Sequence, residues 1–550
     1  MSFPASALLQ MRRAFCFPGF PFVLIGFLAL GTGCGRHEPR ADLVIINNAE
    51  PGSLDPAMGT GYEELRIIMG LWEGLMRVDP QTARPIPGLA ERYEVSPDGL
   101  VYTFHLRSNA VWSTGEPITA RDVEYSWLRV LAKSTGSEYV GQLFYIKNAE
   151  PWYNGTMKDR SQLGIRVIDD STLRVELTHP TAFFPGLCAF QTLAVVPRWV
   201  IEQHGDRWLR ARPLPVSGPY LLEDWRVNDK VRLRKNPRYW DAANTHCELI
   251  DLLPIGTPST AFNLYRAGEV DIIWDKELVP PELFATLRDT PDYHGFPYLA
   301  TYFIRFNTTK KPFDDARVRR AFTMAIDRQR LVDKIIKSGE PVATHLVPPG
   351  TANYESPAGL PYDVAQAKRL LAEAGFPEGK NFPPFEYFFD ASAGGAAKIH
   401  AKIGVELQEM WQSALGVKAG LRQMEKKVFL KAQSALEYDI SRSSWGGDYN
   451  DPNTFLDLFL SNNGNNRTGW TNAHYDTLMQ QASVLTDLQR RAALLREAET
   501  ILVREEAPIA PIYFNIGFNY YNPTNVQGLW GNILDLHPLN AIRRTRSGGK

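Results

Sequence analysis

The stretch LAERYEVSPDGLVYTFHLRSNAVWSTGEPITARDVEYSW, Leu89 to Trp127, contains a turn, a strand and a helix start in close succession. Ser96 to Gly99 (SPDG) has the residues of a tight turn. Val101 to Arg107 (VYTFHLR) alternates apolar and polar side chains, which predicts a half-buried strand. Thr119 to Asp122 (TARD) has the spacing of a capping box, which predicts that a helix begins there. This sequence of elements favours a mixed architecture of strands and helices.

The same mixture continues along the chain, because some segments have the helical period and others alternate. Residues 217–225 and 230–236 predict two strands close enough to pair as a hairpin. The pattern as a whole predicts an α/β or α+β protein with several discontinuous domains. Further strands are expected at 42–47 and 300–307, and helices at 62–75, 315–327, 363–375 and 396–416.

Length and composition are those of an ordinary globular protein. The chain has 550 residues, of which 44% are hydrophobic and 22% charged, so two or three domains with a large core are expected. The formal net charge is −1. Because a nucleic-acid-binding chain usually carries a strong basic excess, we expect no nucleic-acid partner.

The N-terminus has the pattern of a secretory signal. Arg12 and Arg13 precede an apolar run, residues 14–30, and the small residues of GTGCG follow at 31–35. Cys34 resembles the lipidated cysteine of bacterial lipoproteins, although Gly31 stands where that family favours leucine. We expect an exported protein anchored through a lipid on Cys34. Simple export, with Cys34 in an N-terminal tail, is the alternative.

Two cysteines lie in the body of the chain. Cys188 and Cys247 could form a disulfide in an oxidising compartment, or they could be two buried free thiols. Neither cysteine belongs to a metal-binding pattern, and the ten histidines lack metal-ligand spacing. We therefore expect neither a metal nor a cofactor.

Enzyme signatures are missing from the sequence. It contains no GxSxG, HExxH or GxGxxG motif. Residues 375–381 (GFPEGKN) imitate a phosphate-binding loop, but that segment is one residue short and has Asn381 where Ser or Thr is needed. We expect a protein that is not an enzyme.

Seven motifs in a fixed order carry a specific resemblance. The motifs are EPGSLDP (50–56), LWEGLMRVDP (71–80), the stretch 89–127, SGPYLLEDW (217–225), NPRYWD (236–241), PFDDARVRRAF (312–322) and WGGDYNDP (445–452). With them the chain resembles the extracytoplasmic solute-binding proteins of peptide ABC transporters, and among them most the oligopeptide-binding members, from about residue 40 to about residue 540.

The resemblance implies a two-lobed α/β clamp that closes on its ligand about a hinge, with a third, extra domain. It also implies a monomer in the periplasm or cell envelope whose partners are a short peptide and the permease of an ABC transporter. The expected parts are a signal at 1–34, lobe I at 40–62 plus 192–299 plus 520–545, the extra domain at 63–191 and lobe II at 300–519.

The segment SWGGDYNDP, Ser444 to Pro452, is the expected ligand site. A buried carboxylate is the natural partner of a peptide's α-ammonium group, since hydrogen bonds between charged groups are strong. The resemblance places Asp448 at the residue that holds the ligand's N-terminus. As an alternative, an acid in this segment caps a helix at 450–455, which suits Asp451 better than Asp448.

Neighbouring residues are given roles by the same resemblance. Trp445 forms apolar wall, Gly446 and Gly447 let the backbone approach the peptide, and Arg442 faces ligand carboxylates or Asp448 itself. Tyr139 lines the cleft.

Four further positions are matched, each with an alternative reading. Tyr298 and Phe303 face the ligand or belong to the core. Glu50 meets ligand backbone or is solvated. His400 meets a ligand C-terminus or is a surface or core histidine.

One position departs from the family. In QMEKKVFL, residues 423–430, Lys426 follows Glu425 where the oligopeptide-binding members have tryptophan. We expect Lys426 to pair with a ligand carboxylate and to favour acidic, short or cell-wall peptides.

Peptide import is the function expected. Other readings are a receptor of the same fold for a non-peptide solute, a receptor for a cell-wall (murein) peptide, and a receptor that passes a peptide signal to a sensor. A hydrolase would need a nucleophile constellation that the sequence lacks.

Overall fold

A computed structural model describes residues 38–391 and 396–545 of the chain. The expected signal segment and Cys34 lie outside the described residues. The described residues from Ala41 onward form one unit. None of the helices in the described ranges is long and apolar enough to cross a membrane.

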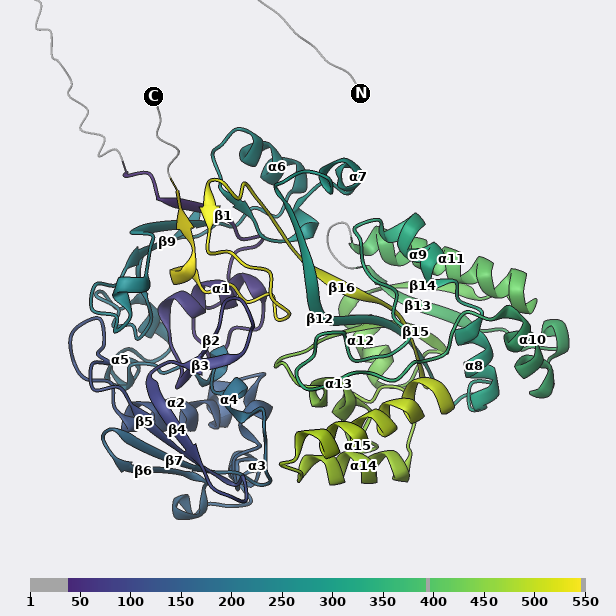
Figure 1. Ribbon diagram of the computed structural model, residues 1–550, viewed down its shortest axis with the longest axis horizontal. Coiled ribbons are helices and arrows are strands. Elements are labelled where there is room, and N and C mark those ends of the chain that lie inside the picture. Colours follow the sequence, from purple (N-terminus) through teal and green to yellow (C-terminus); the bar gives the residue numbers. More distant parts are fainter. Residues whose placement is uncertain (1–37, 392–395, 546–550) are drawn as a thin grey trace, which may run out of the picture. The chain divides into compact units, whose positions relative to one another are not determined.

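A ten-stranded mixed sheet runs through this unit, in the order β14-β13-β15-β12-β16-β11-β1-β10-β9-β8. The two long central strands β12 (Tyr293–Phe306) and β16 (Ile509–Tyr521) pair antiparallel and connect the two halves of the sheet (Figure 1). Their register shifts between Pro297 and Thr301. The other strands are β14 (Gly420–Glu425), β13 (Glu386–Ala391), β15 (Ile440–Gly446), β11 (Ile272–Ile273), β1 (Leu43–Ile46), β10 (Leu249–Leu253), β9 (Lys230–Lys235) and β8 (Tyr220–Arg226).

The half around β1 follows the sequence pattern closely. All four residues of β1 are buried between parallel neighbours β10 and β11, as a continuous apolar run predicts. Strands β8 and β9 form the predicted antiparallel hairpin. Helices α5 (Arg198–His204), α6 (Pro258–Arg266) and α7 (Phe284–Leu287) also belong to this half.

Helix α1 (Tyr62–Leu71) is shorter than the predicted helix over 62–75. It ends at Leu71, because Trp72 has the extended backbone angles φ −126° and ψ 145°. Further along, a Cβ on Gly74 would lie 2.4 Å from the carbonyl oxygen of Cys188. The backbone can approach so closely only without a side chain.

A separate four-stranded sheet has the order β4-β5-β7-β6. The predicted capping box is confirmed, since the Thr119 N–H donates to Asp122 Oδ2 over 2.8 Å at the start of α2. The elements here are β4 (Ala90–Val95), β5 (Val101–Leu106), β7 (Thr172–Glu176), β6 (Ile165–Asp169), α2 (Ala120–Val130), α3 (Ala149–Asn154) and α4 (Phe184–Leu187), with the small pair β2 (Met76–Val78) and β3 (Pro85–Pro87).

Helices surround the half of the sheet that contains β13 and β15 (Figure 1). The predicted helices over 315–327, 363–375 and 396–416 are confirmed as α8 (Ala316–Met324), α10 (Val364–Glu373) and α11 (Ala396–Leu415). Phe322 of α8 and Trp411 of α11 are fully buried against each other, with ring centroids 5.3 Å apart. The remaining helices are α9 (Arg328–Leu331), α12 (Lys426–Ser434), α13 (Asn453–Leu456), α14 (Ala473–Ser483) and α15 (Leu488–Thr500).

Cys188 and Cys247 are both buried and both free. The structure therefore has the two thiols rather than the disulfide. Their packing is that of small apolar residues.

Candidate ligand-binding site

The segment SWGGDYNDP begins as the end of strand β15 and continues as a loop. Ala300 of β12 is the register partner of Gly446, and the Gly447 N–H donates to the Leu299 carbonyl over 2.7 Å. A Cβ on Gly447 would lie 2.4 Å from Leu299 Cδ2. Packing against the connecting strand is therefore what requires glycine at 447, whereas Gly446 lines a cavity.

Asp448 faces that cavity, which has a volume of about 380 Å³. Its walls also carry Tyr139, Tyr298 and Trp445, so with Asp448 four of the expected site residues come together here beside Gly446 and Gly447. Tyr62 belongs to the same wall. The hydroxyls of Tyr62 and Tyr298 contact each other, which joins α1 to β12. The Nε1 of Trp445 is buried and has no hydrogen-bond partner within the described residues.

Within the described ranges, the Asp448 carboxylate has no cationic partner. Burial raises its pKa to about 6, and the opposing influence is a hydrogen bond that Gln142 Nε2 donates to Oδ2 over 3.2 Å. A carboxylate that is buried yet solvated only by a neutral amide is destabilised in its charged form. An incoming ammonium group would supply the missing positive charge.

A second cavity of about 340 Å³ is also lined by Asp448. Its walls are mainly apolar and include Met69, Val78 and Phe183. Six residues line both cavities: Leu65, Phe190, Gln191, Asp448, Leu534 and Leu536. A ligand that reaches Asp448 therefore has two neighbouring cavities available to it.

The second half of the segment is packed into the protein. Tyr449 stacks on Phe183, with ring centroids 4.3 Å apart and 10° between the planes, and its hydroxyl lies 3.3 Å from that of Tyr145. Asp451 forms a two-fold ion pair with Arg491 at 2.7 and 2.9 Å. Asp451 also accepts from the Asn453 N–H over 2.9 Å, so this residue has the helix-start role.

Arg442 lies earlier on β15 and contacts Asp390, which is fully buried. The expected contact of Arg442 with Asp448 is therefore wrong, because Arg442 pairs with Asp390 instead. Its other expected role, to face ligand carboxylates, stays a prediction. His400 stacks on Tyr302 with centroids 5.7 Å apart, and its Nδ1 has no partner within the described residues. Burial and the nearby Arg442 charge lower the pKa of His400 to about 4, so the imidazole is neutral at pH 7.

Lys426 is the first residue of α12 and is exposed. Among the described residues it has no ion-pair partner, because Glu425 instead accepts from the N–H groups of Lys427 and Val428 at the helix start. Strand β13 runs parallel to both β14 and β15. Lys426 directly follows β14 and Trp445 is near the end of β15, so both lie at the carboxyl ends of parallel strands, on the same edge of the sheet. Ligands of open α/β sheets bind at this edge.

Two expected positions have other surroundings. Glu50 accepts from Trp225 Nε1 over 2.7 Å and from the Asn228 N–H over 2.9 Å. Phe303 is fully buried, with its ring centroid 6.2 Å from that of Phe459, so of its two alternatives the structure has the core placement. Neither residue lines the two cavities beside Asp448.

Several residues at the site were not predicted, among them Tyr62, Gln142 and Gln191. Gln142 belongs to SEYVGQL, the segment that supplies Tyr139, so its neighbourhood was found but its role was not. Tyr62 and Gln191 belong to no local pattern that marks a ligand contact.

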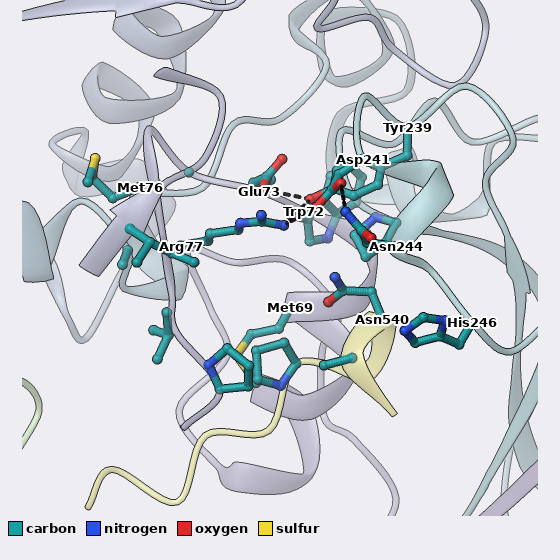
Figure 2. Close-up of a pocket in the computed structure, with 18 of the residues that line it drawn as sticks. Met69, Trp72, Glu73, Met76, Arg77, Tyr239, Asp241, Asn244, His246 and Asn540 are labelled. Atoms are coloured by element: carbon teal, nitrogen blue, oxygen red, sulfur yellow. Dashed lines mark hydrogen bonds and ion pairs between the residues drawn. The ribbon is translucent and has the colours of Figure 1, made fainter. Parts of the chain in front are cut away.

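A third cavity, of about 310 Å³, shows what two of the seven motifs do (Figure 2). Glu73 of LWEGLMRVDP accepts from Tyr239 and Trp240 of NPRYWD over 2.8 and 2.7 Å. Arg77 extends toward Asp241 and pairs with it at 2.8 Å. Because these groups already bind one another, they hold the fold together rather than await a ligand.

The chain matches a known family over most of its length. The model of the bacterial extracellular solute-binding proteins, family 5 (middle), covers residues 84–467. The probable deoxycholate-binding periplasmic protein YgiS of Escherichia coli (strain K12) is 36% identical over 476 residues, which are 85% of this chain and 87% of that protein. The periplasmic oligopeptide-binding protein OppA of Salmonella typhimurium is 35% identical over 513 residues, which are 92% of this chain and 91% of that protein.

Solved structures agree with the sequence comparison. The Escherichia coli murein tripeptide binding protein MppA superposes with a TM-score of 0.76 and 33% identity over 92% of this chain and 99% of that one. The expected α/β clamp of two lobes is thereby confirmed as the fold class. This protein belongs to the family-5 extracellular solute-binding proteins of bacteria.

Proposed function

We propose that the protein is the substrate-binding component of an ABC transporter, which captures oligopeptides outside the cytoplasmic membrane and delivers them to the permease for import. The observation that carries the proposal is Asp448, a buried carboxylate that lines two cavities and has no cation beside it among the described residues. A peptide's terminal ammonium group would complete its charge.

Native mass spectrometry of residues 35–550, purified from an exporting host, tests this function. We expect co-purified masses of short peptides with the wild-type protein and their loss with Asp448→Asn, which keeps the side-chain shape and removes the charge. A protein that arrives without ligand and ignores a mixed peptide pool would contradict peptide binding.

A cell-wall peptide is the second candidate, favoured by the unpaired Lys426 at the ligand edge of the sheet. Lys426 and Arg442 supply positive charge toward a ligand's carboxylates, with His400 as a neutral hydrogen-bonding group. Direct competition between a neutral tripeptide and a murein tripeptide separates the two candidates. Deoxycholate belongs in the same assay, since one relative is named for it.

The division of the chain is a proposal as well: lobe I at 40–62, 192–299 and 520–545, the extra domain at 63–191 and lobe II at 300–519. The register shift in β12 between Pro297 and Thr301, beside the boundary at 299/300, supports it. Limited proteolysis with and without peptide would test the boundaries.

We further propose that the protein is a lipid-anchored monomer. The small residues before Cys34 support the anchor. Cell fractionation should find the wild-type protein with membranes and Cys34→Ser in the soluble extracytoplasmic fraction. Light scattering of the purified protein tests the monomer.

A further inference from the structure

Gln191 is a buried polar residue whose acceptor is unused. It begins the short helical turn η4 (Gln191–Leu193), and 7% of its surface is exposed. Its Oε1 atom is buried and has no hydrogen-bond partner within the described residues. Burying a carbonyl without a partner is costly, so such an atom requires an explanation.

The position of Gln191 supplies one, because it belongs to the wall that the two cavities share with Asp448. The residue therefore lines the same two cavities as the carboxylate that we assign to the ligand's ammonium group. The Gln142 amide already donates to Asp448 Oδ2, whereas Gln191 Oε1 is an acceptor without a partner within the described residues.

The backbone around Gln191 is held firmly. Its own carbonyl accepts from the Ala194 N–H over 3.0 Å, and the Leu193 carbonyl accepts from Trp127 Nε1 over 3.0 Å. The preceding Phe190 packs edge-on against Tyr139, with ring centroids 5.0 Å apart. With its backbone fixed and only 7% of its surface exposed, Gln191 has little freedom to lose when a ligand arrives.

A primary ammonium group brings three hydrogen-bond donors. The three N–H bonds of an ammonium group diverge, so the single Asp448 carboxylate, which also accepts from Gln142, cannot receive all three. We infer that Gln191 Oε1 is a second acceptor for the ligand's terminal ammonium group, and that this pair selects primary amines over amines with fewer N–H groups. The inference rests on the proposed function, because it assumes that Asp448 binds an amine.

Isothermal titration calorimetry with a tripeptide and its N,N-dimethyl analogue tests the assignment. Both ligands are cations, but the analogue has one N–H donor. In Gln191→Leu we expect affinity for the tripeptide to fall about tenfold, as for a lost hydrogen bond to a charged group, and affinity for the analogue to change less than about twofold. Gln412→Leu, on the exposed face of α11, is the control and should match the wild type.

Gln191→Glu tests the direction of the hydrogen bond. A carboxylate keeps an acceptor at this position, so the tripeptide should bind at least as tightly as to the wild type. Equal losses in the Leu and Glu variants would show that the amide donates to the ligand, and the inference would be overturned.

The ratio of the two affinities separates the assignment from a structural role. A change in the shape of the wall would weaken both ligands together and leave their ratio unchanged, which would overturn the inference while peptide binding stands. A wild-type protein that binds neither ligand would overturn the proposed function and the inference together. Thermal unfolding should show Gln191→Leu as stable as the wild type, because it removes an unpaired buried carbonyl.

Discussion

The two aspartates of SWGGDYNDP, Asp448 and Asp451, are both buried but have different hydrogen-bond partners. Asp451, in the second half, is buried with Arg491 and satisfied by two short hydrogen bonds. Asp448, in the first half, is also buried but receives a single hydrogen bond from the neutral Gln142. A buried charge that has its counter-charge belongs to the fold, whereas one that lacks it is suited to a ligand.

Removing the ion pair between Asp451 and Arg491 should have the largest effect, and the effect should be on stability. Asp451→Ala leaves the Arg491 guanidinium buried without a partner, so we expect the free energy of unfolding to fall by about 3–5 kcal/mol. Urea denaturation followed by circular dichroism measures the change. The double variant Asp451→Leu/Arg491→Met should recover most of the loss, and a wild-type stability of Asp451→Ala would refute the structural role.

Asp448→Asn should have the opposite effects: stability is kept and peptide affinity is lost. Its unfolding free energy at pH 7 should equal or slightly exceed that of the wild type, because no partner is orphaned. Peptide affinity should fall by about 2–5 kcal/mol, the range for losing one member of a buried charge pair. Calorimetry and denaturation of the same sample measure affinity and stability. If Asp448→Asn loses stability but keeps affinity, Asp448 has a structural role and does not bind the ligand.

The raised pKa of Asp448, about 6, predicts pH-dependent binding. Below pH 6 the free protein holds a proton that the ligand's ammonium must displace, so affinity should fall up to tenfold, or about 1.4 kcal/mol, per pH unit. The sign for folding is opposite: a raised pKa makes this group favour the folded state at low pH and costs stability as the pH rises through 6. Titrations from pH 5 to 8 should show the dependence in the wild type and much less of it in Asp448→Asn.

The stacked pair between Phe183 and Tyr449 connects the residue that follows Asp448 to the start of α4. Phe183→Leu keeps an apolar side chain but removes the stacked face, so Tyr449 and the adjacent Asp448 should be held less firmly. We expect peptide affinity to fall by about 0.5–1.5 kcal/mol, the usual contribution of an aromatic pair. Tyr362→Leu, at an exposed aromatic residue, is the control. Unchanged affinity in Phe183→Leu would mean that the backbone alone positions Asp448.

The comparison also explains what could be read from the sequence. Elements with a strong period were predicted correctly, because local spacing decides them, and Asp448 was chosen as the ligand residue from the motif around it. The partners could not be found in this way, since Arg491, Gln142 and Asp390 reach their contacts from segments remote in the chain. The contact of Arg442 with Asp390 depends on the pairing of β13 with β15, which no local pattern specifies.

The smallest effect is expected at Lys426, where the charge is exposed and water screens it. Lys426→Glu should weaken acidic peptides relative to neutral ones by about 0.2–1 kcal/mol, with a difference that shrinks as salt rises. Lys427→Glu makes the same charge change one residue further along α12 and separates a local contact from the general field. If both variants shift the preference between acidic and neutral peptides equally, Lys426 does not contact the ligand. Ligand selection then depends on the residues around Asp448.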